Sequence, residues 1–435
     1  MPDSPPHPSR PLAQDLEQAA RNIHQILFSH SSERLSLENS PAVSDLTYRG
    51  LRHWGLAQVR AARLATKAPD PQILCLLAVA WAALADALRP AHTVVDEAVA
   101  AAKKLAPAAA AQKVAGFVNA LLRKTLSDVA GCDQDWVQSV AQWNAPLWWI
   151  QKIQKDYPNQ AVAVLEGLRT RAPLTVRLVD ASAPAMSAFV EQLRAMGLTG
   201  FCVGPQAVAI VPGVPVERIP GFASGQVSVQ DAAAQVAATL FSSMTASSTI
   251  LDACAAPGGK SIALAQRYPV VVWAVDESAA RLERLRRDLG RVAPTLRGRL
   301  EIRVANLLQE SDCTRAGLPQ QFDAILFDAP CSASGVVRRH PEIAWKRTPH
   351  DLARVVDTQR RLLDTLWRRL KPGGEFVFVT CSIFSEEGED QVQQFLKRTP
   401  DAQPMPSPGR LLPIGNAAAG IDQDGFFYAK FKKQV

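Results

Sequence analysis

The stretch STILDACAAPGGKSIALAQ, residues 248–266, has the pattern of a strand, a tight loop of small residues and then a helix. Gly258 and Gly259 allow the loop backbone to approach a ligand closely, and the first turn of the helix exposes unpaired N–H groups. The spacing is not GxGxxG, which disfavours a dinucleotide, and it is not GxxxxGK followed by Ser or Thr, which excludes a P-loop. We therefore expect a strand-end loop that binds a cofactor through its backbone.

Strands and helices alternate from Gln226 to the end of the chain, as they do in a parallel doubly wound sheet. The second strand of this region ends in Asp276, a position from which acidic residues accept hydrogen bonds from ribose hydroxyls. The sequence therefore predicts a Rossmann-like α/β domain over residues 226–435, with its cofactor site at the carboxyl ends of the strands. The expected strands are 248–253, 270–276, 301–306, 323–328, 375–381 and 425–431.

The part of the chain before this domain has two different patterns. Residues 12–157 are rich in Ala and Leu at three- and four-residue spacing, which predicts an all-α domain. Residues 158–225 are typical of a small α+β module, with two strands at 172–180 and 207–212 and a helix that ends at Gly197. The Pro-rich residues 1–11 lack the apolar core of a signal peptide, and we expect them to be a disordered tail.

Composition sets wider limits on the class of protein. A chain of 435 residues is too long for one ordinary core, its hydrophobic content of 47% is globular, and no apolar run reaches membrane-spanning length. Its seven cysteines are scattered without a CxxC pair, which predicts reduced thiols in the cytoplasm and no metal site. The net charge of +7 is compatible with a polyanionic partner.

Two apolar runs each end in a cysteine followed by a serine: LFDAPCSASG at 326–335 and FVFVTCSIF at 376–384. In a doubly wound sheet these two strands should be neighbours, and both ends should open on the ligand crevice. Together with DACAAPGGKS, the motifs resemble, in order and placement, those of the S-adenosylmethionine-dependent RNA cytosine-5 methyltransferases. The resemblance covers nearly all of the chain after the tail and implies S-adenosyl-L-methionine as the cofactor.

The same resemblance implies roles for the residues around that cofactor. Asp276 would bind the ribose, and Asp328 would lie beside both cofactor and base. The third strand of the family normally ends in an Asp that accepts from the adenine amino group, whereas this chain has Asn306, whose carbonyl can still accept that bond. The loop implied to wrap the methionine and ribose consists of Cys254, Ala255, Ala256, Pro257, Gly258, Gly259 and Lys260.

Methylation at carbon-5 of cytosine explains why two cysteines are useful. Carbon-5 is a poor nucleophile until a thiolate adds to carbon-6, and a second thiol can assist release of the covalent intermediate. The family pattern makes the TCS cysteine the nucleophile and the PCS cysteine the releasing partner, which implies these roles for Cys381 and Cys331. Asp328 is assigned to the hydrogen bond or proton at the position-3 nitrogen. DNA cytosine-5 methyltransferases use the opposite cysteine assignment with a Glu-Asn-Val motif, and no such motif follows Cys331, which favours RNA.

The segment GVVRRHPEIAWKR, residues 335–347, interleaves basic residues with a tryptophan. This composition suits phosphate contact and base stacking on single-stranded or flipped-out RNA. The candidate RNA contacts are Arg338, Arg339, His340, Trp345, Lys346 and Arg347.

Resemblances elsewhere in the chain point to a ribosomal substrate. The helical domain resembles the NusB antitermination factor in residues 42–55, 90–99 and 116–124, and the middle module resembles an RRM-like element. This arrangement is that of the bacterial 16S rRNA (cytosine-5) methyltransferases of the Sun or Fmu type. It implies a monomeric cytoplasmic enzyme that acts on the cytosine at position 967 of 16S rRNA, as naked RNA or in a partly assembled small subunit. Two alternatives stay open: the same chemistry on tRNA, and an RNA-binding assembly or antitermination factor with a vestigial methyltransferase fold.

Overall fold

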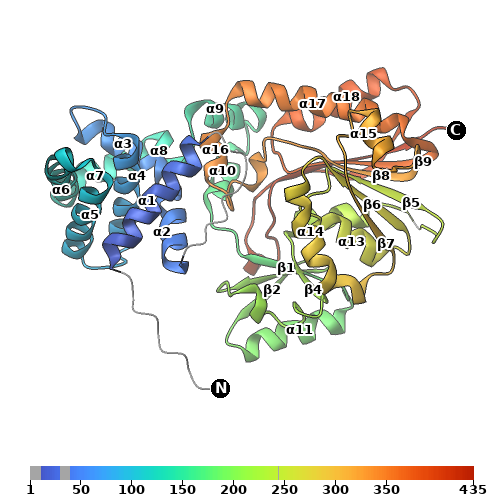
Figure 1. Ribbon diagram of the computed structural model, residues 1–435, viewed down its shortest axis with the longest axis horizontal. Coiled ribbons are helices and arrows are strands. Elements are labelled where there is room, and N and C mark those ends of the chain that lie inside the picture. The colour runs from blue at the N-terminus through green and yellow to red at the C-terminus, as the bar shows by residue number, and fades with distance from the viewer. Residues whose placement is uncertain (1–10, 30–39, 243) are drawn as a thin grey trace. The chain divides into compact units, whose positions relative to one another are not determined.

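The computed structural model describes residues 11–29, 40–242 and 244–435, and Figure 1 shows its ribbon. The chain forms two compact units, one of Met1–Lys155 with His340–Lys346 and the other of Asp156–Arg339 with Arg347–Val435. The predicted disordered tail lies outside the described residues, except for Pro11, which precedes the first helix. None of the described helices combines the length and apolar character that a bilayer-spanning segment needs.

The first unit is helical, as the spacing of its apolar residues predicts. Helix α4, Pro71–Ala85, is apolar on nearly every side, and such a helix is stable only when it is surrounded by others. It starts where Asp70 accepts a hydrogen bond from the Gln72 N–H and Pro71 takes the first helical position. Helices α1, α2, α3, α5 and α6 contact it. The other helices of this unit are α1 Leu12–Phe28, α2 Pro41–Arg52, α3 Trp54–Leu64, α5 Ala91–Leu105, α6 Ala111–Ser127, α7 Val129–Val137, α8 Ser139–Trp143 and α16 Glu342–Lys346, with α9 Leu147–Asp156 following and reaching one residue into the second unit.

The small α+β module is an antiparallel sheet in the order β2-β3-β1-β4. The two predicted strands and the helix are present, and Gly197 follows the helix at a φ of 75°. The sequence analysis missed the outer strands β2 and β4 and the preceding helix α10. The elements are α10 Ala161–Arg169, β1 Leu174–Leu178, α11 Ala183–Ala195, β2 Thr199–Gly204, β3 Ala207–Val211 and β4 Val227–Val229.

The larger sheet has seven strands in the order β10-β11-β9-β8-β5-β6-β7. Its five strands from β9 to β7 are parallel, as predicted, whereas β10 and β11 run antiparallel, so the sheet is mixed. The sequence analysis missed β10, which contains three prolines and lies at the sheet edge, where a missing N–H is tolerated. The strands are β5 Thr249–Ala253, β6 Val271–Asp276, β7 Arg299–Val304, β8 Phe322–Asp328, β9 Leu370–Thr380, β10 Ala402–Leu411 and β11 Phe426–Lys433.

Helices cover both faces of this sheet, which leaves its central strands buried (Figure 1). One face packs against the apolar side of α17, where Leu362, Leu363, Leu366 and Trp367 are buried. The other face packs against α13 and the short helix before β5. The helices are α12 Ala232–Gln235, α13 Gly259–Arg267, α14 Ala279–Val292, α15 Glu310–Arg315, α17 Pro349–Arg368 and α18 Glu389–Arg398.

Candidate active site

The loop between β5 and α13 has the tight backbone that its sequence predicts. Cys254 has a φ of 61° and Gly258 a φ of 99°, and this left-handed region is disfavoured for a residue with a side chain. A Cβ on Gly258 would also overlap the side chain of Leu285 on α14. Glycine is therefore required here on two grounds, and it lets α13 begin at Gly259 directly after the loop.

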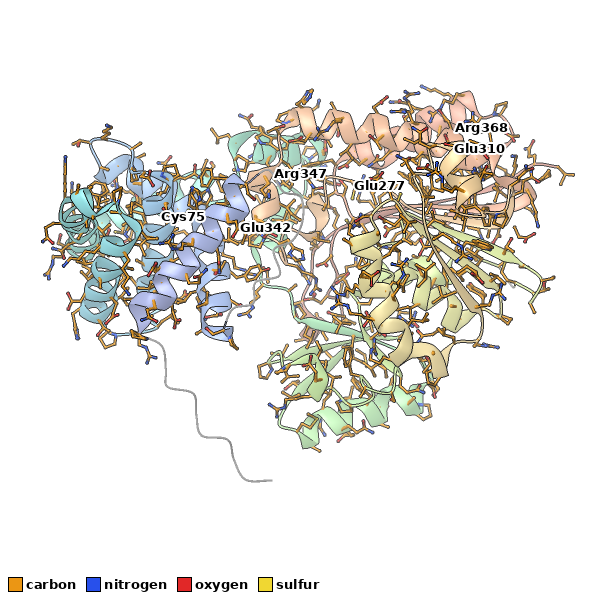
Figure 2. The ribbon with its side chains drawn as sticks, in the orientation of Figure 1. Cys75, Glu277, Glu310, Glu342, Arg347 and Arg368 are labelled. Carbon is orange, nitrogen blue, oxygen red and sulfur yellow. The ribbon has the colours of Figure 1, made fainter. Side chains whose placement is uncertain are left out.

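Asp276 ends β6 and holds this loop in place. Its two carboxylate oxygens accept hydrogen bonds from the N–H groups of Ala256, at 3.1 Å, and Ser278, at 3.0 Å. The residue is 3% exposed, so its carboxylate is largely committed to the backbone. The next residue, Glu277, is exposed and lies at the carboxyl edge of the sheet, where Figure 2 labels it.

A hollow of about 560 Å³ opens beside Glu277 and is also lined by Asn306, which follows β7. The Asn306 side-chain oxygen accepts a hydrogen bond from the Leu308 N–H at 2.9 Å. Small-molecule sites have volumes of roughly 300–1,000 Å³. The hollow has the size and the polar groups that a nucleoside requires. Glu277 is a ribose-binding candidate that the sequence analysis missed, although it directly follows the acidic residue that was chosen.

Lys260 and Asp328 form an ion pair, with 2.7 Å between the ammonium nitrogen and a carboxylate oxygen. Burial lowers the pKa of Lys260, but the Asp328 carboxylate outweighs burial and the pKa is raised overall. A thiolate at Cys381 acts in the same direction. The lysine also lies 5.4 Å from the centre of the Phe426 ring. The loop lysine is thus a charged member of the site.

The two Cys-Ser turns meet, as the sequence predicts for neighbouring strand ends. β8 pairs with β9 in parallel, and Asp328 stands opposite Val379. The sulfur atoms of Cys331 and Cys381 are 3.3 Å apart. The pKa of Cys331 is raised well above its ordinary value by the hydrogen bond to Cys381 and by burial. The raised pKa favours the protonated thiol at Cys331, and either sulfur can be the donor in the contact.

A second buried acid lies beneath the cofactor loop, and the sequence analysis did not single it out. Asp252 is fully buried and accepts a hydrogen bond from the Ser261 hydroxyl at 2.5 Å. Burial raises its pKa to about 7. The position of an acidic residue inside an apolar strand, directly before the loop, was the available signal.

The structure corrects the RNA-contact prediction for Arg338. This side chain is 3% exposed and pairs with Asp422 and, at 2.8 Å, with Asp424. Arg339 pairs with Asp424 at 2.6 Å and with Asp231 at 2.8 Å. Arg338 is buried away from any RNA, and Arg339 could reach a phosphate only by giving up carboxylates that already neutralise it.

The segment His340–Lys346 belongs to the helical unit rather than to the second unit. Trp345 is half-buried and packs against the apolar core of the helical unit, and its role as a stacking platform for RNA bases stays a prediction. His340 lies 3.5 Å from the Glu342 carboxylate, and Lys346 is half-buried in the same segment. Arg347 donates to the Ser332 carbonyl at 3.3 Å, so it supports the loop that carries Cys331.

Among the residues that the structure describes, no cluster of three or more His, Cys, Asp or Glu side chains could hold a metal ion. The site thus comprises a backbone loop for a cofactor, an acid-lined hollow, a Lys–Asp pair and two thiols in contact. They lie at one edge of a mixed sheet with five parallel strands. This fold and this site define a Rossmann-like methyltransferase.

Comparison with known proteins specifies the family. Residues 240–432 match the family described as 16S rRNA methyltransferase RsmB/F, and residues 145–217 match the ferredoxin-like domain of RsmF/B-like methyltransferases. The chain therefore belongs to the RsmB/F family of 16S rRNA methyltransferases.

Individual relatives agree with this assignment. Ribosomal RNA small subunit methyltransferase B of Vibrio cholerae is 38% identical over 79% of this chain and 77% of its own length. The protein of the same name from Xanthomonas campestris is 36% identical over 84% and 81%, respectively. The crystal structure of PH0851 has the same fold, with a TM-score of 0.72 at 20% identity, over 96% of this chain and 99% of its own.

Proposed function

We propose that this protein transfers a methyl group from S-adenosylmethionine to carbon-5 of a cytosine in 16S rRNA through a covalent cysteine adduct. The observation that carries the proposal is the contact of 3.3 Å between Cys331 and Cys381, beside the Lys260–Asp328 pair. Methylation at a ring nitrogen or a ribose oxygen needs no thiol, whereas carbon-5 requires a nucleophile to activate the ring. The relatives named ribosomal RNA small subunit methyltransferase B support 16S rRNA as the substrate.

The cofactor would be held by the 254–260 loop and by the acid-lined hollow. Two features suit this cofactor: a ligand can approach the loop backbone around Gly258 closely, and a hollow is lined by Glu277 and Asn306. In this proposal Asp276 shapes the loop and contributes to ribose binding, while Asn306 accepts from the adenine amino group. Bound there, S-adenosylmethionine supplies an electrophilic methyl group.

Cys381 acts as the nucleophile. Lys260 supplies the neighbouring cation that is typical of reactive cysteines. The thiolate adds to carbon-6 of cytosine, which makes carbon-5 enamine-like and able to attack the methyl group. After methyl transfer a base, such as a water molecule, takes the carbon-5 proton; the electron pair of that C–H bond re-forms the ring double bond, and the bond between carbon-6 and sulfur breaks to release Cys381 as a thiolate. Cys331, which keeps its proton, donates a hydrogen bond to the departing Cys381 thiolate and so promotes release.

Asp328 and Lys260 act together at the position-3 nitrogen of the base. Addition of the thiolate places negative charge on the ring, and a donor at this nitrogen offsets that charge. The ion pair at 2.7 Å provides both a carboxylate and an ammonium donor at the strand end. Lys260 donates to Asp328 at 2.7 Å, so the two side chains belong to one hydrogen-bonded unit that supplies the donor at this nitrogen.

RNA recognition is assigned to the parts of the chain outside the sheet. We propose that the helical region 12–157 is a NusB-like RNA-binding domain and that the ferredoxin-like module over 158–225 adds a further contact. The catalytic domain is then 226–435, except that its first strand, β4, pairs with β1 in the sheet of the module. Lys346 and Arg347 remain the RNA-contact candidates of the 335–347 segment. We propose that the enzyme works as a cytoplasmic monomer.

Covalent trapping on RNA tests the chemistry. Cys381→Ala should abolish methyl transfer, whereas Cys331→Ala should accumulate a protein–RNA adduct that survives denaturing electrophoresis. Cys202→Ala changes an exposed thiol on β2 and serves as the control with normal activity. An active Cys381→Ala enzyme, or a Cys331→Ala enzyme that is inactive without an adduct, would reverse the two cysteine roles.

Bisulfite mapping of RNA from cells with and without the gene tests the substrate. The cytosine at position 967 of 16S rRNA should lose its methyl group in the deletion strain. A small-subunit map that is unchanged, with a loss in tRNA instead, would establish the tRNA alternative.

A further inference from the structure

Glu387 is a buried carboxylate that contacts both Cys-Ser turns. It ends the short helix Ser385–Glu387 and has no exposed surface. One carboxylate oxygen accepts a hydrogen bond from the Ser332 N–H at 2.6 Å. The other accepts from the hydroxyls of Ser332 and Ser382, each at 2.5 Å. A single side chain thus binds the residue that follows each of the two site cysteines.

Further hydrogen bonds join the same two turns. The Ser334 hydroxyl lies 2.8 Å from that of Ser382 and accepts from the Ile383 N–H at 2.9 Å. The Gly335 N–H donates to the carbonyl of Cys381 itself, also at 2.9 Å. The turns after β8 and β9 are therefore cross-linked by a hydrogen-bonded network that is closed from solvent.

The network is also attached to the rest of the domain. Gln359, on α17, donates to the Pro330 carbonyl at 2.8 Å and to Glu387 at 3.3 Å. Thr380, the last residue of β9, donates through its hydroxyl to the Glu387 carbonyl at 3.1 Å. Glu387 thus receives donors from the Cys331 turn, from the Cys381 turn and from a helix that covers the sheet.

We propose that Glu387 is a positioning residue that sets the distance between the Cys331 and Cys381 sulfur atoms, through Ser332 and Ser382. The proposal rests on the cysteine chemistry proposed above. Burying a carboxylate is costly unless hydrogen bonds compensate, and here the compensating donors are the residues next to the two thiols. Each turn then needs a serine after its cysteine, because the serine hydroxyl donates a hydrogen bond to Glu387.

Positioning matters because the two thiols act on one ring in sequence. A displacement of about 1 Å at a reacting group can lower a rate by on the order of 10²-fold. Glu387→Gln keeps the size of the side chain but places an NH₂ group against either the Ser332 N–H or the two hydroxyls. Ser382→Ala removes one hydroxyl and leaves the carboxylate in place.

Glu375 provides a matched control. Glu375 lies in the middle of β9 and pairs with Lys430 of β11. It accepts from the N–H of Ser242 at 2.8 Å and from its hydroxyl at 2.7 Å, as Glu387 does with Ser332. Glu375→Gln therefore removes a similar carboxylate–serine interaction from the same domain without touching the turns that carry the thiols.

Two measurements test the proposal, and one of them does not depend on activity. The first measurement is the rate at which diamide oxidises Cys331 and Cys381 to a disulfide, followed by mass spectrometry. Diamide takes one electron and one proton from each thiol and is itself reduced to the hydrazine. The second measurement is the rate of adduct formation with RNA that contains 5-fluorocytidine. We expect Glu387→Gln to lower both rates at least about tenfold, with Ser382→Ala in the same direction, while S-adenosylmethionine affinity stays within about twofold. Glu375→Gln should leave both rates unchanged.

The outcomes separate the two proposals. If Glu387→Gln and Ser382→Ala cross-link and form adducts at the wild-type rates, Glu387 does not position the thiols. If Glu375→Gln lowers both rates as much as Glu387→Gln, the effect is one of general stability and the positioning role is wrong. If the wild type cross-links readily but forms no adduct, and Glu387→Gln slows the cross-link, the positioning role stands and the proposed reaction fails.

Discussion

Replacing Arg338 by Met separates a structural role from an RNA-binding role for the basic segment. The change leaves the buried Asp422 without the Arg338 guanidinium and leaves the buried Asp424 with only that of Arg339. Removing one partner of a buried ion pair costs about 3–5 kcal/mol. At roughly 2–4 °C per kcal/mol for a domain of about this size, the unfolding temperature should fall by about 6–20 °C.

The pH dependence of this loss follows from Asp424. Burial raises its pKa to about 6, and the loss of Arg338 would raise that pKa further. The carboxyl group is then neutral at pH 5 and charged at pH 8, so the destabilisation should be larger at pH 8. Thermal unfolding at the two pH values measures this, with RNA affinity determined at low temperature on the folded protein.

Two further variants sharpen the measurement. Arg360→Met removes an exposed ion pair with Asp357 and should cost no more than about 0.5 kcal/mol. Adding Asp422→Asn to Arg338→Met should restore part of the lost stability, because one of the uncompensated charges is gone. An Arg338→Met protein with wild-type stability and weakened RNA binding would refute the structural assignment and reinstate the RNA contact.

Two other perturbations test the cofactor loop. Gly258→Ala should abolish measurable S-adenosylmethionine binding in calorimetry, because it adds both a clash with Leu285 and backbone strain. Gly317 is the control, since it has a φ of 68° but open space around it. Gly317→Ala should lower stability only by the backbone strain of about 1–2 kcal/mol and should bind S-adenosylmethionine normally. Burial raises the pKa of Asp252 to about 7, so the folded state holds this proton more tightly than the unfolded state does. As the pH rises from about 4 to about 7, wild-type stability should therefore fall by up to about 1.4 kcal/mol per pH unit. Asp252→Asn should flatten that slope in unfolding experiments at pH 5 and pH 8, and an unchanged slope would exclude Asp252 as its source.

The parts of the fold that the sequence predicts well are those with a local signal. The strands β5, β6, β8 and β9 contain apolar runs, and the rule for doubly wound sheets then places Asp328 and Cys381 at neighbouring strand ends. The glycines of the cofactor loop likewise signal a constrained backbone, which the φ of Gly258 confirms.

The errors concern interactions between distant segments. Arg338 reads as a solvent-exposed base because its partners Asp424 and Asp422 lie 86 and 84 residues further along the chain. Trp345 lies within the catalytic half of the sequence, yet its apolar contacts are with helices near the N-terminus. Glu387 was not noticed, because nothing in an exposed-looking SEEGED stretch indicates that one of its acids is buried against Ser332. A local sequence pattern indicates which secondary structure a segment favours. The roles of Arg338, Trp345 and Glu387 depend instead on which distant residues the fold brings next to them.

The seven-residue segment His340–Lys346 has a consequence for how this protein can be divided. The chain leaves the second unit after Arg339, contributes Trp345 to the helical core and returns at Arg347. A cut near residue 155 would therefore deprive the N-terminal fragment of part of its apolar interior and leave the C-terminal fragment with an uncovered tryptophan. The two units are interlaced along the sequence, so neither can be deleted or exchanged between relatives as one continuous piece.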